Sequence, residues 1–470
     1  MPTFSLMILA TMIGVIITIL FLLITGRSII KGIYSIYYNR TKILKSFNLT
    51  NKVGLGLQGE TEFQSALRNP LNYQLSRKAM LSPWKEILFN PVYLHRLPLL
   101  DYQKVGTNVI IGEKTRYPLK LKIPIMIAGM AYGTILSAQT KQALAMGATI
   151  AGTTTNTGNG PFLPDERVAA EKLVIQYSRG RWTKDLEVLK AADAIEIQLG
   201  QGLWGPIPEE FRPSRLARNP KLRRVIGVNP GERAMIPPRL LEVKDEEDLG
   251  ELVESIRQKT GGIPIGIKIG ATQWLEKELE LLVRTNPDFL AIDGVEGENY
   301  GGLALNLESM GTPTLYATYR ARNFLEKRNL AGKIALLVGG GLYTPMDFLK
   351  ALALGADAVF IGTIGLIALL QTQRNKLFPW EPPTKLIFNE STQKNKLNIP
   401  LAAESLSNFL KAAVQEMQIA ALCLGRNHLQ EVNKSDLSSS NKKLAEYLGI
   451  QWCGESMEIS HLSKLGHVKR

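Results

Sequence analysis

The sequence has few of the residues on which several common kinds of site depend. Only two of its 470 residues are cysteine, Cys423 and Cys453, and neither has a second cysteine at the spacing of metal ligands. Two thiols cannot form a three- or four-thiolate iron–sulfur cluster or a disulfide framework, and their scarcity fits a reducing compartment. The four histidines all lie outside the strands predicted below, so a histidine general base is not expected. Neither a Ser/His/Asp order nor a His-Glu-x-x-His pattern occurs, and no metal site is predicted.

Charged side chains are absent from the first 26 residues. Residues 4–24 are apolar over the length that one helix needs to cross a bilayer, and five basic residues follow between Arg27 and Lys45. A cleavable signal peptide would carry its positive charges before the apolar run. The pattern therefore predicts an uncleaved single-pass anchor in the membrane lipid bilayer, with the bulk of the protein in the cytoplasm.

Acidic residues are fewer than basic ones, 42 Asp and Glu against 56 Lys and Arg, which gives a net charge of +14. No nucleic-acid-binding motif and no interleaving of aromatic and basic residues accompanies this charge, so no nucleic acid partner is predicted. An anionic cofactor, an anionic substrate or the inner face of a membrane would each suit a basic surface. With 45% hydrophobic residues, the chain can bury a full core and is not a disordered protein.

Short apolar runs separated by helix-like stretches are the main feature of the rest of the chain. Eight of them follow Pro124, at residues 125–128, 149–153, 173–177, 194–199, 264–269, 289–293, 334–338 and 358–361. Their apolar residues are continuous rather than alternating, which is typical of parallel strands buried on both faces. Amphipathic helix patterns lie between several of them, at 137–146, 245–259, 274–285 and 315–327. These alternations predict an α/β protein with a (β/α)8 TIM barrel, and a doubly wound sheet is the alternative.

The same pattern divides the chain into four predicted parts. Residues 1–26 are the transmembrane anchor, 27–120 a tether and pre-barrel arm, 121–370 the barrel, and 371–470 a C-terminal helical extension and tail. The stretch 200–262 is much longer than a simple βα connection and is rich in proline and arginine. Long loops of this kind often shape a substrate site.

Two of the predicted strands end in glycine clusters. The strand 334–338 runs into Gly339, Gly340 and Gly341, and the strand 358–361 runs into Gly362 and Thr363, with a helix predicted over 345–355 between them. Glycine lets the backbone approach an anion closely and offer its N–H groups, and parallel strands end where α/β folds bind phosphates. One cluster alone would indicate only a tight turn, but two clusters on consecutive strands favour a phosphate site.

Lys268 stands alone among apolar neighbours in the strand 264–269. A buried ammonium is costly unless an anion compensates it. A structural ion pair with Glu196 or Asp293 is one interpretation. The other is a position beside a phosphate-anchored flavin, whose reduced form is an anion that a fixed positive charge stabilises.

An ordered set of motifs resembles the FMN-binding domain of glutamate synthases, in a single-domain, membrane-anchored form. The matching segments are AGMAYG (128–133), NTG (156–158), Gln176 with GRW (180–182), IEIQLGQG (195–202), GIKI (266–269), DGVEG (293–297), GGL (340–342) and GTIGLIA (362–368). The resemblance covers roughly half of the chain and is more specific than any one glycine motif.

The resemblance implies an FMN-holding barrel that forms L-glutamate reductively from 2-oxoglutarate and an amino donor. The residues implied to hold the cofactor are Gly129, Met130, Ala131, Tyr132, Asn156, Gln176, Lys268, Gly340, Gly341, Gly362 and Thr363. Catalytic roles are expected for Lys268, Gln176 and Glu196. Substrate contacts are expected for Asn159, Gln198, Gln201 and Glu296.

The chain also departs from this family's pattern. Residues 369–400 contain no cysteine, so no Fe-S cluster is expected and the electron donor is unknown. No glutaminase domain precedes the barrel in this sequence, so another source of ammonia is expected. Asn159 stands where the family has a glutamate and Gln198 where it has a lysine; residues 298–300 replace Gly-Thr-Gly, and Gly339 replaces an acidic residue. The flavin site therefore transfers to this chain better than the substrate does.

Three functions are consistent with these observations. The first is an FMN-dependent oxidoreductase of the glutamate synthase kind. The second is an FMN barrel of the same build that acts on a different small acid or amine, which Asn159 and Gln198 favour. The third is a non-catalytic, membrane-tethered binding module that has kept the fold.

Overall fold

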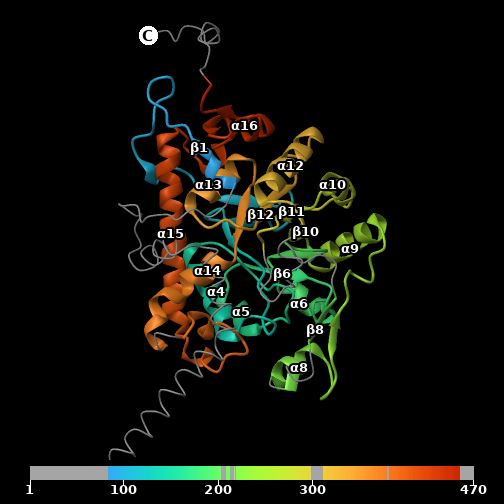
Figure 1. Cartoon of the computed structure of the whole chain (residues 1–470). Helices are drawn as coiled ribbons and strands as arrows, with labels where there is room; N and C mark the ends of the chain where they lie inside the picture. The colour runs from blue at the N-terminus through green and yellow to red at the C-terminus, as the bar shows by residue number, and fades with distance from the viewer. Residues whose placement is uncertain are drawn as a thin grey trace, which may run out of the picture.

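The computed structural model describes residues 83–202, 208–211, 216–217, 219–297, 311–377 and 381–455. Its centre is a sheet of eight parallel strands (Figure 1). In hydrogen-bonded order they are β4 (Ile125–Ile127), β13 (Ala358–Ile361), β12 (Ala335–Gly339), β11 (Phe289–Asp293), β10 (Ile265–Gly270), β7 (Ala194–Gln198), β6 (Leu173–Tyr177) and β5 (Thr155–Asn156). The end strands also meet, because the Ile127 N–H donates to the Thr154 carbonyl at 3.1 Å. The sheet thus closes into a nearly complete barrel, as predicted, and the open doubly wound alternative is wrong.

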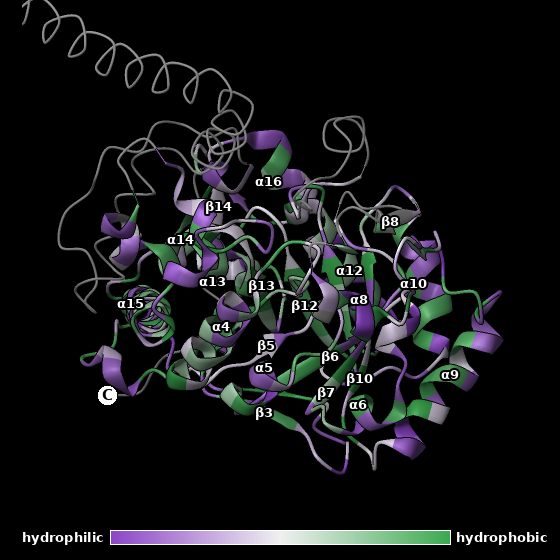
Figure 2. Ribbon diagram, turned by 90° about the horizontal axis from the view of Figure 1, so that it is seen from below, coloured by the Kyte–Doolittle hydropathy of each residue, from purple (hydrophilic) through white to green (hydrophobic). Residues whose placement is uncertain are grey.

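Helices surround these strands (Figure 1). They are α4 (Ala138–Ala151), α5 (Pro164–Ala169), α6 (Leu186–Lys190), α8 (Pro220–Ile226), α9 (Glu246–Lys259), α10 (Leu275–Arg284), α12 (Thr314–Lys327), α13 (Pro345–Ala353) and α14 (Thr363–Leu370). The long connection after β7 also carries a hairpin of β8 (Glu209–Phe211) and β9 (Ala234–Ile236). Figure 2 shows mainly hydrophobic β6 and β7, whereas α9 carries both hydrophobic and hydrophilic residues.

Seven of the eight predicted strands lie within one residue of their predicted ends. The strand predicted at 149–153 is wrong, because α4 continues to Ala151 and Gly152 ends it with a left-handed φ of 76°. Of the apolar residues that suggested a strand, Ala151 lies on the buried face of α4, whereas Ile150 is exposed. The strand that takes this place, β5, is only Thr155–Asn156.

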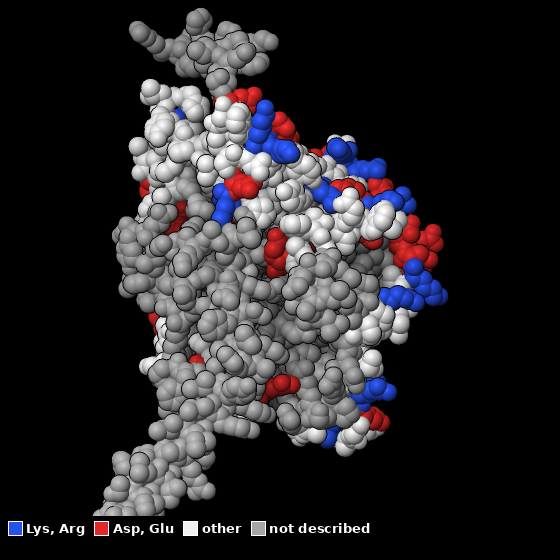
Figure 3. Space-filling model, in the orientation of Figure 1, with Lys and Arg blue, Asp and Glu red and all other residues white. Residues whose placement is uncertain are grey.

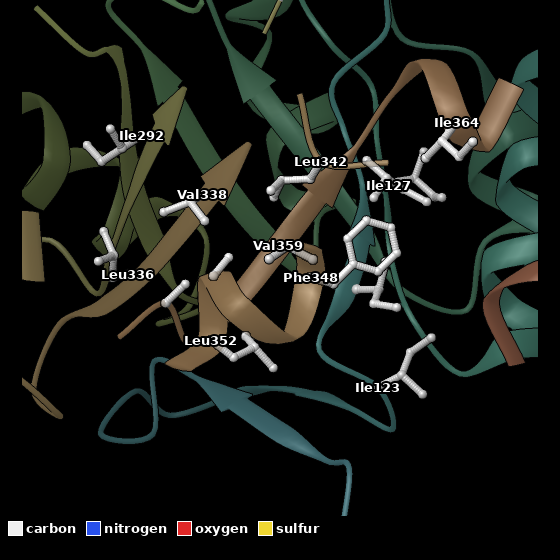
Figure 4. Packing of buried hydrophobic residues seen from close by; sticks show 14 of the residues in the cluster. Ile123, Ile127, Ile292, Leu336, Val338, Leu342, Phe348, Leu352, Val359 and Ile364 are labelled. Atoms are coloured by element: carbon white, nitrogen blue, oxygen red, sulfur yellow. The ribbon is translucent and has the colours of Figure 1, made fainter. Parts of the chain in front are cut away.

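The strand side chains alternate between two hydrophobic cores. On the outside of the barrel they pack against helices, as Val338 and Val359 do near Phe348 of α13 (Figure 4). On the inside, a second cluster occupies the N-terminal part of the barrel; its strand members include Met126, Val174, Ala194, Phe289, Ala291, Leu337, Ala358 and Phe360. The hairpin of β2 (Val109–Ile111) and β3 (Leu119–Leu121) adds four side chains to this inner cluster, so it covers the N-terminal end of the barrel.

Three aspartates form the same kind of hydrogen bond to the backbone at the N-terminal end of the barrel. Asp193, Asp288 and Asp357 stand just before β7, β11 and β13. Their carboxylates accept backbone N–H groups of the neighbouring strands, from Leu173 at 2.9 Å, Ile265 at 2.8 Å and Leu336 at 2.7 Å. Each aspartate therefore ties the start of its strand to the start of the adjacent one.

The described part of the pre-barrel arm pairs with the C-terminal extension. Strand β1 (Ile87–Phe89) lies antiparallel to β14 (Leu437–Ser439), which in turn pairs with β15 (Gln451–Trp452). The fully buried Asp436 receives Arg96 at 2.6 Å and Arg426 at 3.0 Å, which links the same two regions. Helix α15 (Ile399–Cys423) lies along one side of the barrel and packs on α4, while α16 (Lys442–Leu448) lies at one end of the molecule in Figure 1.

The predicted membrane location requires correction. No helix within the described residues is long and apolar enough to cross a bilayer. The segment 4–24, on which the prediction rested, lies outside those residues, as does most of the tether. Figure 3 shows Lys and Arg mixed with Asp and Glu over the described surface of one face, rather than a basic patch. We therefore propose neither a membrane anchor nor a membrane partner.

Candidate functional site

A layer of polar side chains fills the C-terminal part of the barrel interior. Gln176, Glu196, Gln198, Lys268 and Asp293 lie on the inward faces of β6, β7, β10 and β11, and none is more than 7% exposed. Glu196 and Gln198 follow Ala194 at every second residue, and Ala194 belongs to the inner apolar cluster. Because strand side chains alternate, all three point into the barrel. The interior is thus apolar at its N-terminal end and polar at the end where TIM-barrel enzymes place their sites.

Lys268 is held between two carboxylates. Its Nζ lies 3.0 Å from Asp293 Oδ2 and 5.3 Å from the centroid of the Phe360 ring. Burial by itself lowers the pKa of Lys268, but Asp293 and then Glu196 outweigh it, and the pKa lies above its usual value. The ion pair between Lys268 and Asp293, one of the two interpretations of the sequence, is therefore present. It holds a positive charge inside the barrel.

Glu196 joins three strands through its carboxylate. Its Oε1 accepts hydrogen bonds from Gln176 Nε2 at 2.6 Å and from Asn156 Nδ2 at 3.1 Å. Its other oxygen, Oε2, and the Gln176 Oε1 are both buried and find no hydrogen-bond partner among the described residues. Buried polar atoms are nearly always partnered in native proteins, so these two oxygens mark a place where a ligand would complete the site.

Gln198 and Gln201 form a second pair next to Lys268. Gln198 is the register neighbour of Lys268 across β7 and β10. Its Nε2 donates to Gln201 Oε1 at 2.6 Å, whereas its own Oε1 is buried and has no partner in the part of the chain that the structure describes. Two of the predicted substrate residues are therefore brought together beside the central lysine.

The loop after β4 packs tightly on the loop after β5. A Cβ on Gly129 would lie 2.9 Å from Asn156 Oδ1, and one on Gly158 would lie 2.8 Å from the Ala131 nitrogen. Within this contact Ala131 and Tyr132 are buried and Met130 is half-buried. The predicted flavin loop is thus adjacent to Asn156, which in turn contacts Glu196.

Asn159, another predicted substrate residue, lies at the edge of this region. It is 9% exposed, and its backbone carbonyl accepts a hydrogen bond from the Trp182 indole at 3.0 Å. Trp182 packs edge-on against Phe211 of β8. This contact connects the β5 loop to the hairpin that β8 and β9 form.

The glycine clusters lie side by side at the ends of β12 and β13, which pair in parallel. Gly340 has a φ of 109°, and a Cβ there would lie 2.7 Å from both the Gly297 nitrogen and Thr314 Oγ1. Gly362, in contrast, has open space around a Cβ position, with the nearest atom 4.0 Å away, and it precedes the first residue of α14, Thr363. The backbone N–H groups at the start of this helix therefore face an accessible region, as anion sites at helix N-termini require.

Glu296 lies beside the glycine clusters and not among the central polar residues. Its Oε2 accepts from the Thr314 N–H and from Thr314 Oγ1, both at 2.8 Å. A Cβ on Gly341 would lie 2.6 Å from the Glu296 Cβ. Burial, together with Glu296 and Asp347, raises the pKa of Tyr343 to about 12. The Glu296 carboxylate is thus engaged by the start of α12, next to the glycine cluster of β12.

Two buried charged residues near this site, Lys141 and Glu166, were not singled out from the sequence. Asp293, in contrast, was expected as a partner of Lys268 and as part of the DGVEG motif. Lys141 and Glu166 form a buried ion pair at 2.9 Å, and Lys141 also donates to the Asn156 carbonyl at 2.7 Å. Lys141 is the only charged residue of α4, and a single charged residue in this helix could have indicated a buried ion pair. In the described residues, no group of His, Cys, Asp and Glu is suited to holding a metal ion.

Comparison with known proteins assigns the family. The family described as a conserved region in glutamate synthase matches residues 64–427. The chain belongs to this family. A glutamate synthase large subunit-like protein of Rhizobium meliloti is 31% identical over 405 residues, which cover 81% of this chain and 89% of that protein. An archaeal-type glutamate synthase [NADPH] of Thermotoga neapolitana is 28% identical over 397 residues, covering 82% of this chain and 77% of that protein.

Solved structures share the fold at lower identity. A lactate oxidase of Pediococcus acidilactici has a TM-score of 0.50 and 13% identity, covering 84% of this chain and 92% of that one. A variant of flavocytochrome b2 has a TM-score of 0.50 and 15% identity, covering 87% of this chain and 89% of that one. At these identities the likeness supports the barrel fold and nothing finer.

Proposed function

We propose that this glutamate synthase family member is an FMN-dependent oxidoreductase whose reaction takes place at the C-terminal end of the barrel. The observation that carries the proposal is the buried Lys268, fixed by Asp293 among oxygens that lack partners, on the same barrel end as two adjacent glycine clusters. A cofactor with a phosphate and a polar ring system fits both features. We also propose residues 121–370 as the catalytic domain and 371–470 as its extension.

The phosphate end of FMN fits the ends of β12 and β13. The glycines there, Gly340, Gly341 and Gly362, leave the backbone free of side chains, and α14 begins immediately afterwards. Thr363, the first residue of α14, adds a hydroxyl at this helix end. A dianionic phosphate is stabilised by such N–H groups and by the helix dipole.

The ring end fits the polar layer. The Gln176 Oε1 can accept an N–H from a flavin ring, and the Lys268 ammonium, held by Asp293, can donate a hydrogen bond to it. When bound, FMN supplies the electron-transfer chemistry. Asp293 holds the Lys268 ammonium in place, and Asn156 with Gln176 orients the Glu196 carboxylate. We propose Gly129, Met130, Ala131 and Tyr132 as the backbone and side-chain wall beside this ring.

Formation of L-glutamate from 2-oxoglutarate and an amino donor is the proposed reaction, because the relatives are named as glutamate synthases. Electrons would come from an external donor. A second candidate is an FMN-dependent reaction on another small acid or amine. The amide pair Gln198 and Gln201, which stands beside Lys268, favours it.

Titration of the purified full-length protein with FMN, followed by quenching of flavin fluorescence, tests the proposal. We expect saturable binding, and we expect Lys268→Met to weaken it by about tenfold or more because one buried charged contact is lost. Lys259→Met removes an exposed lysine at the end of α9 and serves as the matched control with unchanged affinity. Wild-type protein that does not bind FMN would overturn the proposed function.

A further inference from the structure

The amide pair of Gln198 and Gln201 has an unused hydrogen-bond acceptor. Gln198 is 1% exposed, and its Nε2 is engaged by Gln201 Oε1 at 2.6 Å. Its Oε1 accepts no hydrogen bond within the described part of the chain. A buried carbonyl oxygen that is left unpaired has lost its hydration without compensation, so the site gains when a ligand brings a donor to this atom.

The charges around this acceptor do not suit a second anion. Lys268, the register neighbour of Gln198, is already compensated by Asp293 at 3.0 Å and by Glu196. Arg179, the buried cation that follows β6, donates Nη1 to the Pro238 carbonyl at 3.2 Å. A carboxylate placed against Gln198 Oε1 would meet another acceptor, and it would add negative charge to a region with two carboxylates around one ammonium.

We propose that Gln198 and Gln201 bind an N–H-donating end group of the substrate, a primary carboxamide or an ammonium, and thereby select against a dicarboxylate of the same length. This inference rests on the proposed FMN-dependent function and narrows its second candidate reaction, on another small acid or amine, because 2-oxoglutarate and L-glutamate are themselves dicarboxylates. It concerns only one end of the ligand, because a carboxylate at the other end would not touch the amide pair. A lysine at position 198 would reverse the preference, since it would replace the acceptor by a positive charge.

Three amino acids that differ only in their end group test this inference. L-glutamine ends in a carboxamide, L-ornithine in an ammonium, and L-glutamate in a carboxylate. Isothermal titration calorimetry of the full-length protein, with and without FMN, measures each affinity without requiring turnover. We expect L-glutamine or L-ornithine to bind at least about tenfold more tightly than L-glutamate, and the stronger of the two identifies the end group.

Two variants connect the preference to the pair. Gln198→Met keeps the length of the side chain but removes both amide atoms, and it should reduce the preference to about twofold or less. Gln198→Lys should favour L-glutamate. Equal or tighter binding of L-glutamate by the wild type, binding of none of the three, or an unchanged preference in a folded Gln198→Met would each overturn the inference. FMN titration of the same samples shows separately whether the proposed function holds.

Discussion

The two ends of the barrel interior are built from opposite kinds of side chain. At the N-terminal end, apolar residues of the strands pack against the β2–β3 hairpin, and Asp193, Asp288 and Asp357 accept backbone N–H groups. At the C-terminal end, Gln176, Glu196 and Gln198 each have a buried oxygen without a partner among the residues that the structure describes.

This difference separates stability from function within one barrel. A change at a fully packed and hydrogen-bonded end acts on the free energy of folding and on no ligand. An end with unpartnered polar atoms has given up folding free energy, and a bound ligand can recover it. Substitutions at the N-terminal end should therefore affect stability alone, and substitutions at the C-terminal end should also affect ligand binding.

A pair of phenylalanines provides the most direct test and the largest expected effect. Phe289 is 1% exposed in the N-terminal part of the interior, where its ring lies so close to Gly266 that a Cβ there would be 2.2 Å away. Phe289→Ala should lower the free energy of unfolding by about 3–5 kcal/mol and leave the FMN affinity of the folded protein unchanged. Denaturant titration and flavin quenching measure the two quantities.

Phe360→Ala is the matched variant at the boundary between the inner apolar cluster and the polar layer of the C-terminal end. The Phe360 ring is 3% exposed and lies 5.3 Å from Lys268 Nζ. Its truncation should reduce stability to a similar extent and, unlike Phe289→Ala, should also weaken FMN binding because Lys268 loses a neighbour that positions it. Equal FMN affinities for the two variants would argue against the proposed division of the barrel.

The Lys141–Glu166 ion pair lies next to β5 and close to the site. Substitutions in this pair should nevertheless resemble those at the N-terminal end and affect stability alone. Both side chains are at most 2% exposed and 2.9 Å apart, and burial raises the pKa of Glu166 although Lys141 and Arg167 oppose this. Lys141→Met would leave a buried carboxyl unpaired and should cost about 3 kcal/mol of unfolding free energy at neutral pH.

Adding Glu166→Gln to Lys141→Met should recover part of this loss, because no buried charge would then remain. A double-mutant cycle from denaturant titrations measures the coupling between the two positions. A double variant as unstable as Lys141→Met alone would show that the hydrogen bond from Lys141 to the Asn156 carbonyl, and not the ion pair, carries the stabilisation.

Sequence patterns predicted most of the barrel because its strands are buried on both faces and therefore read as continuous apolar runs. They failed at β5, where two polar residues form the strand and no apolar run marks it. The β1–β14 pairing was also not predicted. Its paired residues, such as Ile87 and Ser439, are far apart in the sequence, and neither strand is longer than three residues.

The site residues were found from strand ends and family motifs, but their partners were not. Nothing local in the sequence indicates that Gln198 donates to Gln201 or that Glu196 joins Gln176 and Asn156. These contacts depend on which residues of neighbouring strands lie in the same layer of the barrel interior. The layers are set by the strand register, which a single sequence specifies only weakly.

The smallest expected effect concerns the pH dependence of the N-terminal end. Burial raises the pKa of Asp357, although its hydrogen bond from Leu336 and the charge of Arg322 act in the opposite direction. The native state therefore binds this proton more tightly than the unfolded state, and the contribution of Asp357 to stability falls as pH rises above its usual pKa of 3.8. Asp357→Asn keeps an acceptor for Leu336 without the charge, so near neutral pH it should gain up to about 1 kcal/mol relative to the wild type.

The matched variant is Asp288→Asn, at the equivalent place before β11. Asp288 pairs with Arg257 at 2.6 Å, so its substitution should lower stability at neutral pH instead of raising it. Denaturant titrations of both variants from acidic to neutral pH provide the comparison. If Asp357→Asn also loses stability at neutral pH, the charged carboxylate contributes more to the Leu336 hydrogen bond than its burial costs, and the two aspartates are equivalent after all.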